Sequence, residues 1–457
     1  MSIRHIQWSG HSSLGNLELD FTDDDGQPYR TIVIAGENGT GKTSILESIS
    51  QTAVDPFPDF HDLSCLEFED YETERRIRLQ RRDEAKKDVV AVFMNNDGEP
   101  IDGENNNGVQ TDYLIAQGSL LRFQRQGIAY SRARSGFKTG TIESITTGDR
   151  DWSRARIDAS DDYTPVKQML VNLRTQDDRD FTQIAMQQGV ARWNDYYPRS
   201  RTCRFANAFN GFFDDLAFDR VDQVDGSHQV VFKKHSREIP IDALSTGEKQ
   251  IVYRGAYLLD GLEKDEGGVV LVDEPELSMH PKWQQRVLPF YRGLFPLDRH
   301  NPVQLIIATH SEYVLETALR DSENTLVIAL DDQCGKITSQ RITAPYALNS
   351  LSSSEVKYRV FGVASIDYHV ALFGLLQSYA PGDKVKHCDS FITQQPEYDR
   401  ICHARMSRYG ATEYESLPTY IRNAIDHPSP EKEYNNEDLI TSIELMQAIA
   451  LRLKASK

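Results

Sequence analysis

The sequence lacks the features that mark membrane-spanning, exported and disulfide-rich proteins. No run of apolar residues approaches the roughly 18 that a transmembrane helix needs. The first residues, Met1 to His5, show no basic segment followed by an apolar one, so we expect no secretory signal. Five cysteines are dispersed at positions 65, 203, 334, 388 and 402, which indicates reduced thiols. Together these absences predict a cytoplasmic protein.

Positive charge is also scarce, because 51 Lys and Arg residues stand against 69 Asp and Glu, for a net charge of −18. Such a surface repels nucleic acid and anionic membranes unless a local basic patch opposes the average. One basic patch is present in the sequence, at Arg122, Arg125, Arg132, Arg134 and Lys138. It is either a place where DNA or an acidic protein binds, or a solvated surface whose cations pair with the acidic excess.

A chain of 457 residues, 39% of them hydrophobic, can form two or three domains with their own cores. Short apolar runs alternate with helical patterns from about residue 269 to 330, which indicates a parallel sheet covered by helices. One of these helices is expected over Trp283–Phe295, with a kink or early stop at Pro289. We therefore predict an α/β domain over residues 1–344, with a mainly parallel sheet, a β-rich subdomain and a helical insertion at about 111–240. A helical C-terminal domain is expected over residues 345–457.

The strongest motif is Gly36-Glu37-Asn38-Gly39-Thr40-Gly41-Lys42-Thr43, which fits the P-loop pattern between a buried strand and a helix. The glycines let backbone N–H groups curl around phosphate oxygens, at the positive end of the following helix. The Lys42 ammonium would reach the β and γ phosphates, and the Thr43 hydroxyl would bind Mg²⁺. The predicted nucleotide contacts of this loop are Gly36, Asn38, Gly39, Gly41, Lys42, Thr43 and Ser44.

Two acidic residues, Asp273 and Glu274, follow the apolar strand Val269–Val272. We expect Asp273 to hold the Mg²⁺ together with Thr43, and Glu274 to act as the general base toward the attacking water. A histidine, His310, follows the apolar residues Ile306–Ala308. If that strand neighbours the strand of Asp273, His310 can reach a γ-phosphate.

A third segment, Leu244-Ser245-Thr246-Gly247-Glu248-Lys249-Gln250, precedes these strands. Taken alone it is a plausible helix start, with Ser245 as N-cap and Glu248 completing a capping box. In combination with the P-loop it resembles the signature segment of ABC-type ATPases.

The ordered motifs GENGTGKT, LSTGEKQ, VDEPE and ATHS together resemble the ABC-type ATPases, in the SMC-like branch often labelled AAA-family ATPases. The resemblance covers about residues 1–330 and implies that the signature of one protomer caps the ATP held by the P-loop of another. It implies that Ser245, Gly247 and Glu248 lie at the partner's nucleotide, and that Glu274 and His310 are the base and the switch residue. The Q-loop glutamine is not obvious, and Gln117 is our candidate.

The layout of an ATPase followed by a helical tail resembles the ATPase subunits of anti-phage systems, most of all the AriA ATPases of PARIS systems and next the PtuA ATPases of Septu systems. The resemblance implies a homo-oligomeric scaffold, with ATP and Mg²⁺, that holds a toxic nuclease, TOPRIM-type in AriA systems, and releases it on contact with a phage-encoded trigger. A second reading is a DNA-repair or recombination ATPase of the SMC-like class, which would bind DNA. The short coiled-coil-free chain argues against a chromosome-tethering arm.

The C-terminal third contains Arg422 and His427, whose spacing resembles the R-x4-6-H motif of HEPN ribonucleases. A third reading is therefore a toxin whose tail cleaves RNA. The alternative is a helix end that His427 caps and Pro428 stops. The pairs His387-Cys388 and Cys402-His403 do not have the spacing of a usual zinc site.

Overall fold

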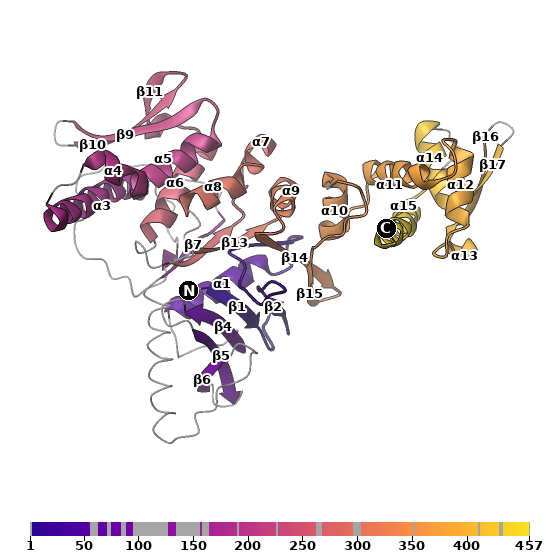
Figure 1. The fold of residues 1–457 in the computed structure, drawn as a ribbon, viewed down its shortest axis with the longest axis horizontal. Helices are drawn as coiled ribbons and strands as arrows, with labels where there is room; N and C mark the ends of the chain where they lie inside the picture. Colours follow the sequence, from indigo (N-terminus) through magenta and orange to yellow (C-terminus); the bar gives the residue numbers. More distant parts are fainter. Residues whose placement is uncertain are drawn as a thin grey trace. The chain divides into compact units, whose positions relative to one another are not determined.

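The computed structural model describes residues 2–54, 63–70, 75–83, 88–94, 127–133, 156–157, 164–189, 192–224, 227–261, 267–295, 303–350, 352–409, 412–428 and 433–456. The chain divides into two compact units, Met1–Arg341 and Ile342–Lys457. Figure 1 shows the helices and strands of both units, and each unit is described by itself below.

An antiparallel sheet forms the β-rich part of the first unit. Its strand order is β2 (Glu18–Asp20), β1 (Ser2–Gln7), β4 (Cys65–Asp70), β5 (Arg75–Asp83) and β6 (Asp88–Met94). Apolar and polar residues alternate along β2, and the apolar Ile3 and Ile6 of β1 are buried on either side of a register shift in its pairing with β4.

A second, mainly parallel sheet carries the sequence motifs. Its strand order is β15 (Lys336–Arg341), β14 (Thr325–Gln333), β3 (Thr31–Gly36), β13 (Val303–Thr309), β12 (Gly268–Asp273), β7 (Ile128–Ser131) and β8 (Arg156–Ile157). Neighbouring strands are parallel, apart from the antiparallel pair of β14 and β15. The carboxyl ends of parallel strands meet at one edge, so this arrangement brings the ends of β3, β12 and β13 together.

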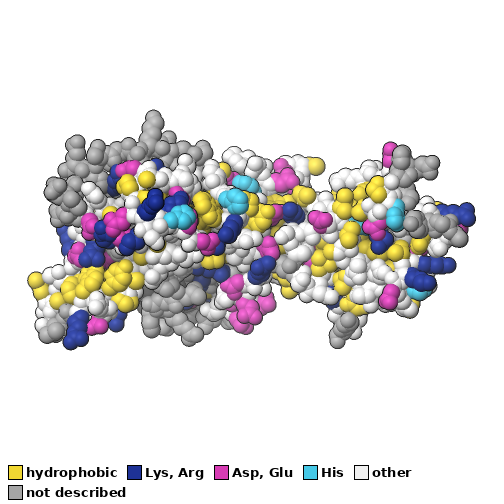
Figure 2. Space-filling view, turned by 90° about the horizontal axis from the view of Figure 1, so that it is seen from above, with side chains coloured by type: hydrophobic (Ala, Val, Ile, Leu, Met, Phe, Trp, Pro, Cys, Tyr) yellow, Lys and Arg dark blue, Asp and Glu magenta, His cyan; other side chains and the backbone are white. Residues whose placement is uncertain are grey.

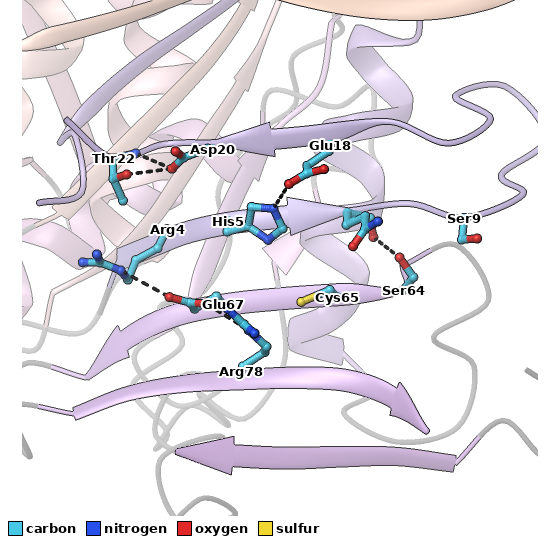
Figure 3. Close-up of a pocket in the computed structure, with 11 residues that line it drawn as sticks. Arg4, His5, Ser9, Glu18, Asp20, Thr22, Ser64, Cys65, Glu67 and Arg78 are labelled. Carbon is cyan, nitrogen blue, oxygen red and sulfur yellow. Dashed lines mark hydrogen bonds and ion pairs between the residues drawn. The ribbon is translucent and has the colours of Figure 1, made fainter. Parts of the chain in front are cut away.

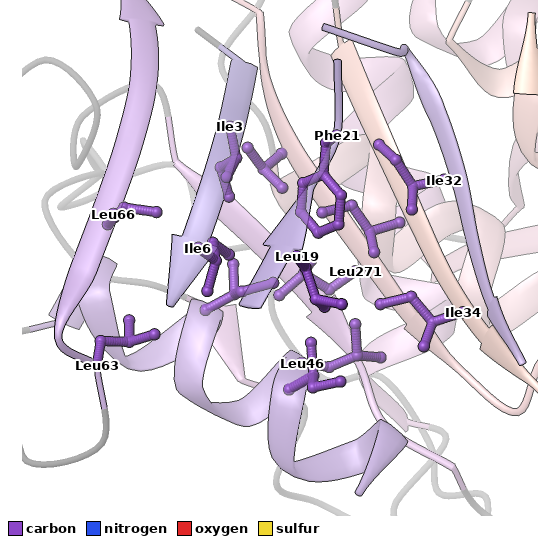
Figure 4. Packing of buried hydrophobic residues seen from close by; sticks show 14 of the residues in the cluster. Ile3, Ile6, Leu19, Phe21, Ile32, Ile34, Leu46, Leu63, Leu66 and Leu271 are labelled. Atoms are coloured by element: carbon purple, nitrogen blue, oxygen red, sulfur yellow. The ribbon is translucent and has the colours of Figure 1, made fainter. Parts of the chain in front are cut away.

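The main core lies between the two sheets and around α1 (Lys42–Val54), as Figure 4 shows. Ile3, Ile6 and Leu19 of the first sheet face the apolar side chains of the second, and Leu46 of α1 packs among them. A pair of buried hydrogen bonds also joins the two sheets. The amide of Gln304, fully buried on β13, accepts from Ile3 N at 2.7 Å and donates to Ile3 O at 2.8 Å.

Helices pack together beside the parallel sheet, next to a three-stranded sheet (Figure 1). The helices of this unit are α3 (Thr164–Gln188), α4 (Trp193–Tyr196), α5 (Arg201–Phe212), α6 (Thr246–Gly261), α7 (Pro281–Gln284), α8 (Val287–Leu294) and α9 (Glu312–Arg320), with short 3₁₀ turns at Tyr197–Arg199 and Ile241–Ala243. The small sheet has the order β11 (Arg237–Pro240), β10 (Ser227–Lys234), β9 (Leu216–Val224). Buried rings of Phe205, Phe209 and Phe232 fasten α5 to this sheet.

Two sequence expectations differ from what is observed in this unit. The segment at about 111–240, expected to be a helical insertion, also supplies β7 and β8 to the parallel sheet and β9 to the small one. The antiparallel pair of β10 and β11 lies where the sequence itself indicates a short strand pair, at Gln229–Phe232 and Glu238–Ile241. The single helix expected over Trp283–Phe295 is two helices that break at Gln285–Arg286, before Pro289. Proline is tolerated there because it lies in the first turn of α8, where a backbone N–H has no intrahelical partner.

Basic and acidic side chains are interspersed on the described part of the first unit that Figure 2 shows, and several of them form ion pairs. Arg220, for example, pairs with Asp219, Asp222 and Glu238. Of the basic patch in the sequence, only Arg132 lies among the described residues, and it pairs with Glu47 at 3.2 Å. The other four residues of the patch lie outside the described part of the chain.

The second unit is mainly helical, with one β-hairpin. Its elements are α10 (Ser353–Phe361), α11 (Ile366–Tyr379), α12 (Val385–Thr393), α13 (Arg400–His403), β16 (Ala404–Tyr409), β17 (Thr412–Ser416), α14 (Leu417–Asp426) and α15 (Asn436–Ala455). Asp389 on α12 accepts from the backbone N–H of Ser416, and α11, α14 and α15 enclose a separate apolar core. Among the described residues no single helix has the length and apolarity to cross a membrane, although the bent pair of α10 and α11 passes the same criteria jointly.

The predicted fold class is confirmed. The chain has an α/β fold with a mainly parallel sheet, and its C-terminal region is mainly helical.

A buried histidine leads us to expect that acid destabilises the second unit. His369 of α11 is fully buried, its Nε2 lies 3.0 Å from the Ser442 hydroxyl, and within the described chain its Nδ1 has no hydrogen-bond partner. Burial lowers the pKa of His369 from 6.5 to about 4. The unfolded chain therefore takes up a proton that the folded unit resists, and stability is lost as the pH falls from 6.5 toward 4, by up to about 3 kcal/mol.

Replacing His369 with Gln, which keeps an amide able to bond Ser442, is expected to remove most of this acid-dependent loss. Hydrogen exchange of α11 and α15 amides in the full chain, compared with wild type at each pH between 7 and 4.5, measures it. His387→Gln, at an exposed position, is the control. Equal acid sensitivity of wild type and His369→Gln would refute the assignment.

Candidate functional site

The loop between β3 and α1 has a backbone that only glycine fits at several positions. Gly39 and Gly41 have φ of +91° and +85°, in the left-handed region that disfavours other side chains. A Cβ atom on Gly36 would lie 2.7 Å from Leu330 O, and one on Gly41 would lie 2.2 Å from Leu14 Cδ2. The loop tip, residues 37–39, is exposed at the N-terminus of a 13-residue helix. This geometry fits a phosphate group.

Lys42 points back into this loop. Its ammonium donates to the carbonyls of Gly36 and Glu37, both at 2.8 Å, and the residue is only 5% exposed. Burial lowers the pKa of Lys42, while the nearby carboxylates of Glu274 and Asp273 act in the opposite direction. A phosphate in the loop would give this ammonium a charged acceptor in place of neutral carbonyls.

Asp273 and Thr43 meet as expected for a magnesium site. The Thr43 hydroxyl donates to Asp273 Oδ2 at 2.9 Å, across 230 residues of sequence. Asp273 Oδ1 is buried and, among the described residues, has no hydrogen-bond partner. Burial raises the pKa of Asp273 to about 6, against the hydrogen bond from Thr43. An unpaired carboxylate oxygen beside a hydroxyl is the donor set that Mg²⁺ takes in P-loop proteins, so the residues present fit the ion.

Glu274 is held in an unusual backbone conformation directly after β12. Its φ is +41°, and its N–H donates to Ala308 O of β13 at 2.9 Å. Arg254, 1% exposed on α6, donates to the carbonyl of Asp273 at 2.9 Å and to that of Glu274 at 3.4 Å. These contacts fix the backbone on both sides of Glu274. Sequence reasoning missed Arg254, because nothing in its neighbourhood distinguishes it from an ordinary helix surface residue.

His310 lies beside the acidic residues at the end of β13. Its Nδ1 is 3.4 Å from Glu274 Oε1 and 3.5 Å from Glu276 Oε1, and its side chain is 43% exposed. Glu276 was also missed from the sequence, although it belongs to the VDEPE motif. Thus Lys42, Thr43, Asp273, Glu274 and His310 are brought together at one edge of the parallel sheet.

The signature residues form a second group, at the start of α6. Ser245 N donates to Glu248 Oε2 at 2.7 Å, and Lys234 of β10 donates to Glu248 Oε1 at 2.7 Å. Burial alone would raise the pKa of Glu248, but the hydrogen bonds from Lys234 and Ser245 keep it below its usual value. The capping-box reading of this segment is therefore realised, and Ser245 itself stays exposed. A Cβ atom on Gly247 would lie 3.1 Å from the Trp283 ring.

Three weaker candidates remain from the sequence. Gln117 lies outside the described residues. Arg422 on α14 pairs with Asp426 at 2.6 Å and stacks over the ring of Phe373, 5.6 Å from its centroid. The backbone N–H of His427 donates to Asn423 O at the end of α14, as its helix-capping alternative requires.

A polar hollow of about 680 Å³ on the first sheet is separate from the motifs (Figure 3). Several of the charges that line it pair with one another: Arg78 donates to Glu67 at 2.9 Å, and His5 Nε2 lies 2.8 Å from Glu18 Oε1. The residues that line it include none of the P-loop or signature residues.

Comparison with known proteins agrees with the geometry. Residues 5–208 match a family described as "AAA domain", and residues 122–316 match one described as "AAA domain, putative AbiEii toxin, Type IV TA system". The chain is related to AAA-domain ATPases.

Among curated proteins, it is 30% identical over 159 residues to "Retron Ec83 probable ATPase" of Escherichia coli, which is 33% of this chain and 27% of that protein. It is 20% identical over 350 residues to "Septu protein PtuA" of Bacillus mycoides (strain KBAB4), which is 74% of this chain and 42% of that protein. The chain thus matches well under two thirds of either relative. Among solved structures, the SMC head domain from Thermotoga maritima aligns with 75% of this chain and 100% of its own length, at 14% identity and a TM-score of 0.40.

Proposed function

We propose that this chain binds ATP with Mg²⁺ and hydrolyses it slowly, as the ATPase subunit of an anti-phage defence complex. The observation that carries the ATPase part is the hydrogen bond between Thr43 and Asp273, with Glu274 and His310 beside it. Mg²⁺ bound there would neutralise charge on the phosphates. The Lys42 ammonium would bind phosphate oxygens, and Glu274 would take the proton of the attacking water.

We further propose that two copies meet head to tail, so that Ser245 and Gly247 of one protomer cover the nucleotide in the P-loop of the other. The exposure of Ser245 supports this, as does the internal pairing of Glu248, which holds the start of α6 in one conformation. We call Ser245–Glu248, the segment that would cover the partner's nucleotide, the lid. In this arrangement Glu248 would hold the lid in one conformation, and Ser245 with Gly247 would contact the partner's phosphates.

The defence role rests on the similarity to retron and Septu ATPases. We propose that the ATP-bound oligomer holds a nuclease effector and releases it when a phage protein is sensed, with a TOPRIM-type nuclease as effector if the chain is AriA-like. Co-expression with the protein of the neighbouring gene tests this. The pair should co-purify as a complex of defined mass and should restrict phage, and failure of both results would reject the defence role while leaving the ATPase proposal intact.

Removal of the Lys42 ammonium tests the nucleotide site directly. Lys42→Ala is expected to weaken ATP binding about tenfold to a hundredfold, because a charged hydrogen bond to phosphate is lost. Titration with a fluorescent ATP analogue at fixed Mg²⁺ measures the Kd. Lys336→Ala, at an exposed position on β15, should bind like wild type. An unchanged Kd in Lys42→Ala would mean that the loop is not the nucleotide site.

A further inference from the structure

The segment that carries His310 is tied by two side-chain bridges to the segment that follows Glu274. In the first bridge, Glu276 Oε1 accepts from the Thr309 hydroxyl at 2.6 Å and from the backbone N–H of His310 at 3.0 Å. The Glu276 side chain is 2% exposed, so both bonds lie away from solvent. A buried carboxylate with two short donors is a well-determined contact.

The second bridge uses Gln284 of α7. Its Nε2 donates to Met279 O at 3.0 Å, and its Oε1 accepts from the Ser311 hydroxyl at 2.6 Å. Ser311 is the N-cap of α9 and directly follows His310. The side chains on both sides of His310 and its own backbone N–H are therefore held from the same neighbouring segment, residues 276–284.

We propose that Glu276 and Gln284 are positioning residues that set the orientation of His310 toward Glu274. The imidazole is 43% exposed and would have several accessible rotamers if its backbone were loose. With residues 309 and 311 held, its Nδ1 stays 3.4 Å from Glu274 Oε1. Neither Glu276 nor Gln284 needs to touch the nucleotide for this role, which rests on the proposed ATPase function.

The segment 276–284 that carries these bridges also lies beside the signature residues. Ser278 has a left-handed backbone, with φ of +62°, and is exposed. Ser278 O lies 3.6 Å from the position a Gly247 Cβ would take, so this segment also borders the signature.

Kinetics of matched variants tests the proposal. Glu276→Ala removes both acceptor bonds and the 3.5 Å contact with His310 Nδ1, and should lower kcat about tenfold or more, with a Kd for ATP within about twofold of wild type. Glu276→Gln, whose amide oxygen accepts the same two bonds, should retain most of kcat. Thr309→Val removes one donor and Gln284→Ala removes the second bridge. Each should have a kcat between that of Glu276→Ala and that of wild type. Glu316→Ala and Glu316→Gln on α9 are controls, since Glu316 pairs with Arg320 of the same helix.

Hydrogen exchange at the His310 amide gives a readout that does not need hydrolysis. In the full chain, peptides covering residues 309–311 should exchange at least about tenfold faster in Glu276→Ala than in wild type or Glu276→Gln. Wild-type kcat in Glu276→Ala, or unchanged exchange in that variant, would overturn the proposal. A kcat equally low in Glu276→Gln and Glu276→Ala would also overturn it, because charge and not bond geometry would then be decisive. If the wild-type protein hydrolyses no ATP, the ATPase proposal fails. The hydrogen-exchange rates would still decide whether Glu276 holds the segment around His310.

Discussion

Replacing Glu274 with Gln is expected to lower kcat for ATP by about a hundredfold to ten-thousandfold, the range usual for loss of a general base. The amide keeps the size of the side chain, and the backbone contacts with Arg254 and Ala308 do not depend on the carboxylate. Binding of ATP should therefore persist while proton removal fails. Phosphate release under saturating ATP measures kcat, and native mass spectrometry measures the assembly, which should accumulate as an ATP-loaded dimer.

Glu316→Gln is the matched control for this variant, because it makes the same chemical change on α9 and should turn over at the wild-type rate. Turnover by Glu274→Gln at the rate of Glu316→Gln would show that the base is another group. A Glu274→Gln protein that stays monomeric with ATP and Mg²⁺ would count against the head-to-tail dimer, even if hydrolysis were lost.

Mixing two inactive variants is expected to restore activity if the sites are shared between protomers. Lys42→Ala disables the P-loop and Ser245→Arg places a bulky cation on the lid, so each variant alone should be inactive. A mixed dimer still has one site built from an intact Lys42 and an intact Ser245. At equal amounts, with random pairing, about a quarter of wild-type turnover should return.

The mixing experiment separates shared sites from sites complete in one chain, since the latter would give no recovery. Thr182→Arg, on the exposed part of α3, is the control for the added cation and should be active alone. Mixed dimers form only when protomers exchange between dimers, so the recovered activity should grow with incubation time after mixing. Absence of recovery, in samples whose mixed dimers are seen by native mass spectrometry, would reject the composite site.

The parts of the site that were predictable from sequence are those whose chemistry lies in short contiguous segments. The P-loop needs glycines next to Lys42 and Thr43, and the two acidic residues follow an obvious buried strand, so both can be recognised without a fold. Their convergence follows from parallel strands. The observed bond between Thr43 and Asp273 agrees with that expectation.

What escaped prediction are the contacts between residues distant in sequence that carry no local pattern. Arg254 reaches the backbone of Glu274 from the middle of a helix, and Gln304 bonds to Ile3 across 301 residues. Each is a polar residue whose partner is defined only once the chain has packed. The strands β7 and β8 were likewise missed, because two to four residues are too short for a period to show.

The left-handed backbone at Glu274 has a consequence for how this protein would change under selection. That conformation destabilises the folded state by roughly 1–2 kcal/mol for a residue with a Cβ, and glycine would remove this cost. Glycine at this position would leave the strand end relaxed and the chain more heat-resistant, yet without a group to accept a proton. Selection for thermal tolerance alone would thus favour loss of the side chain on which turnover is proposed to depend.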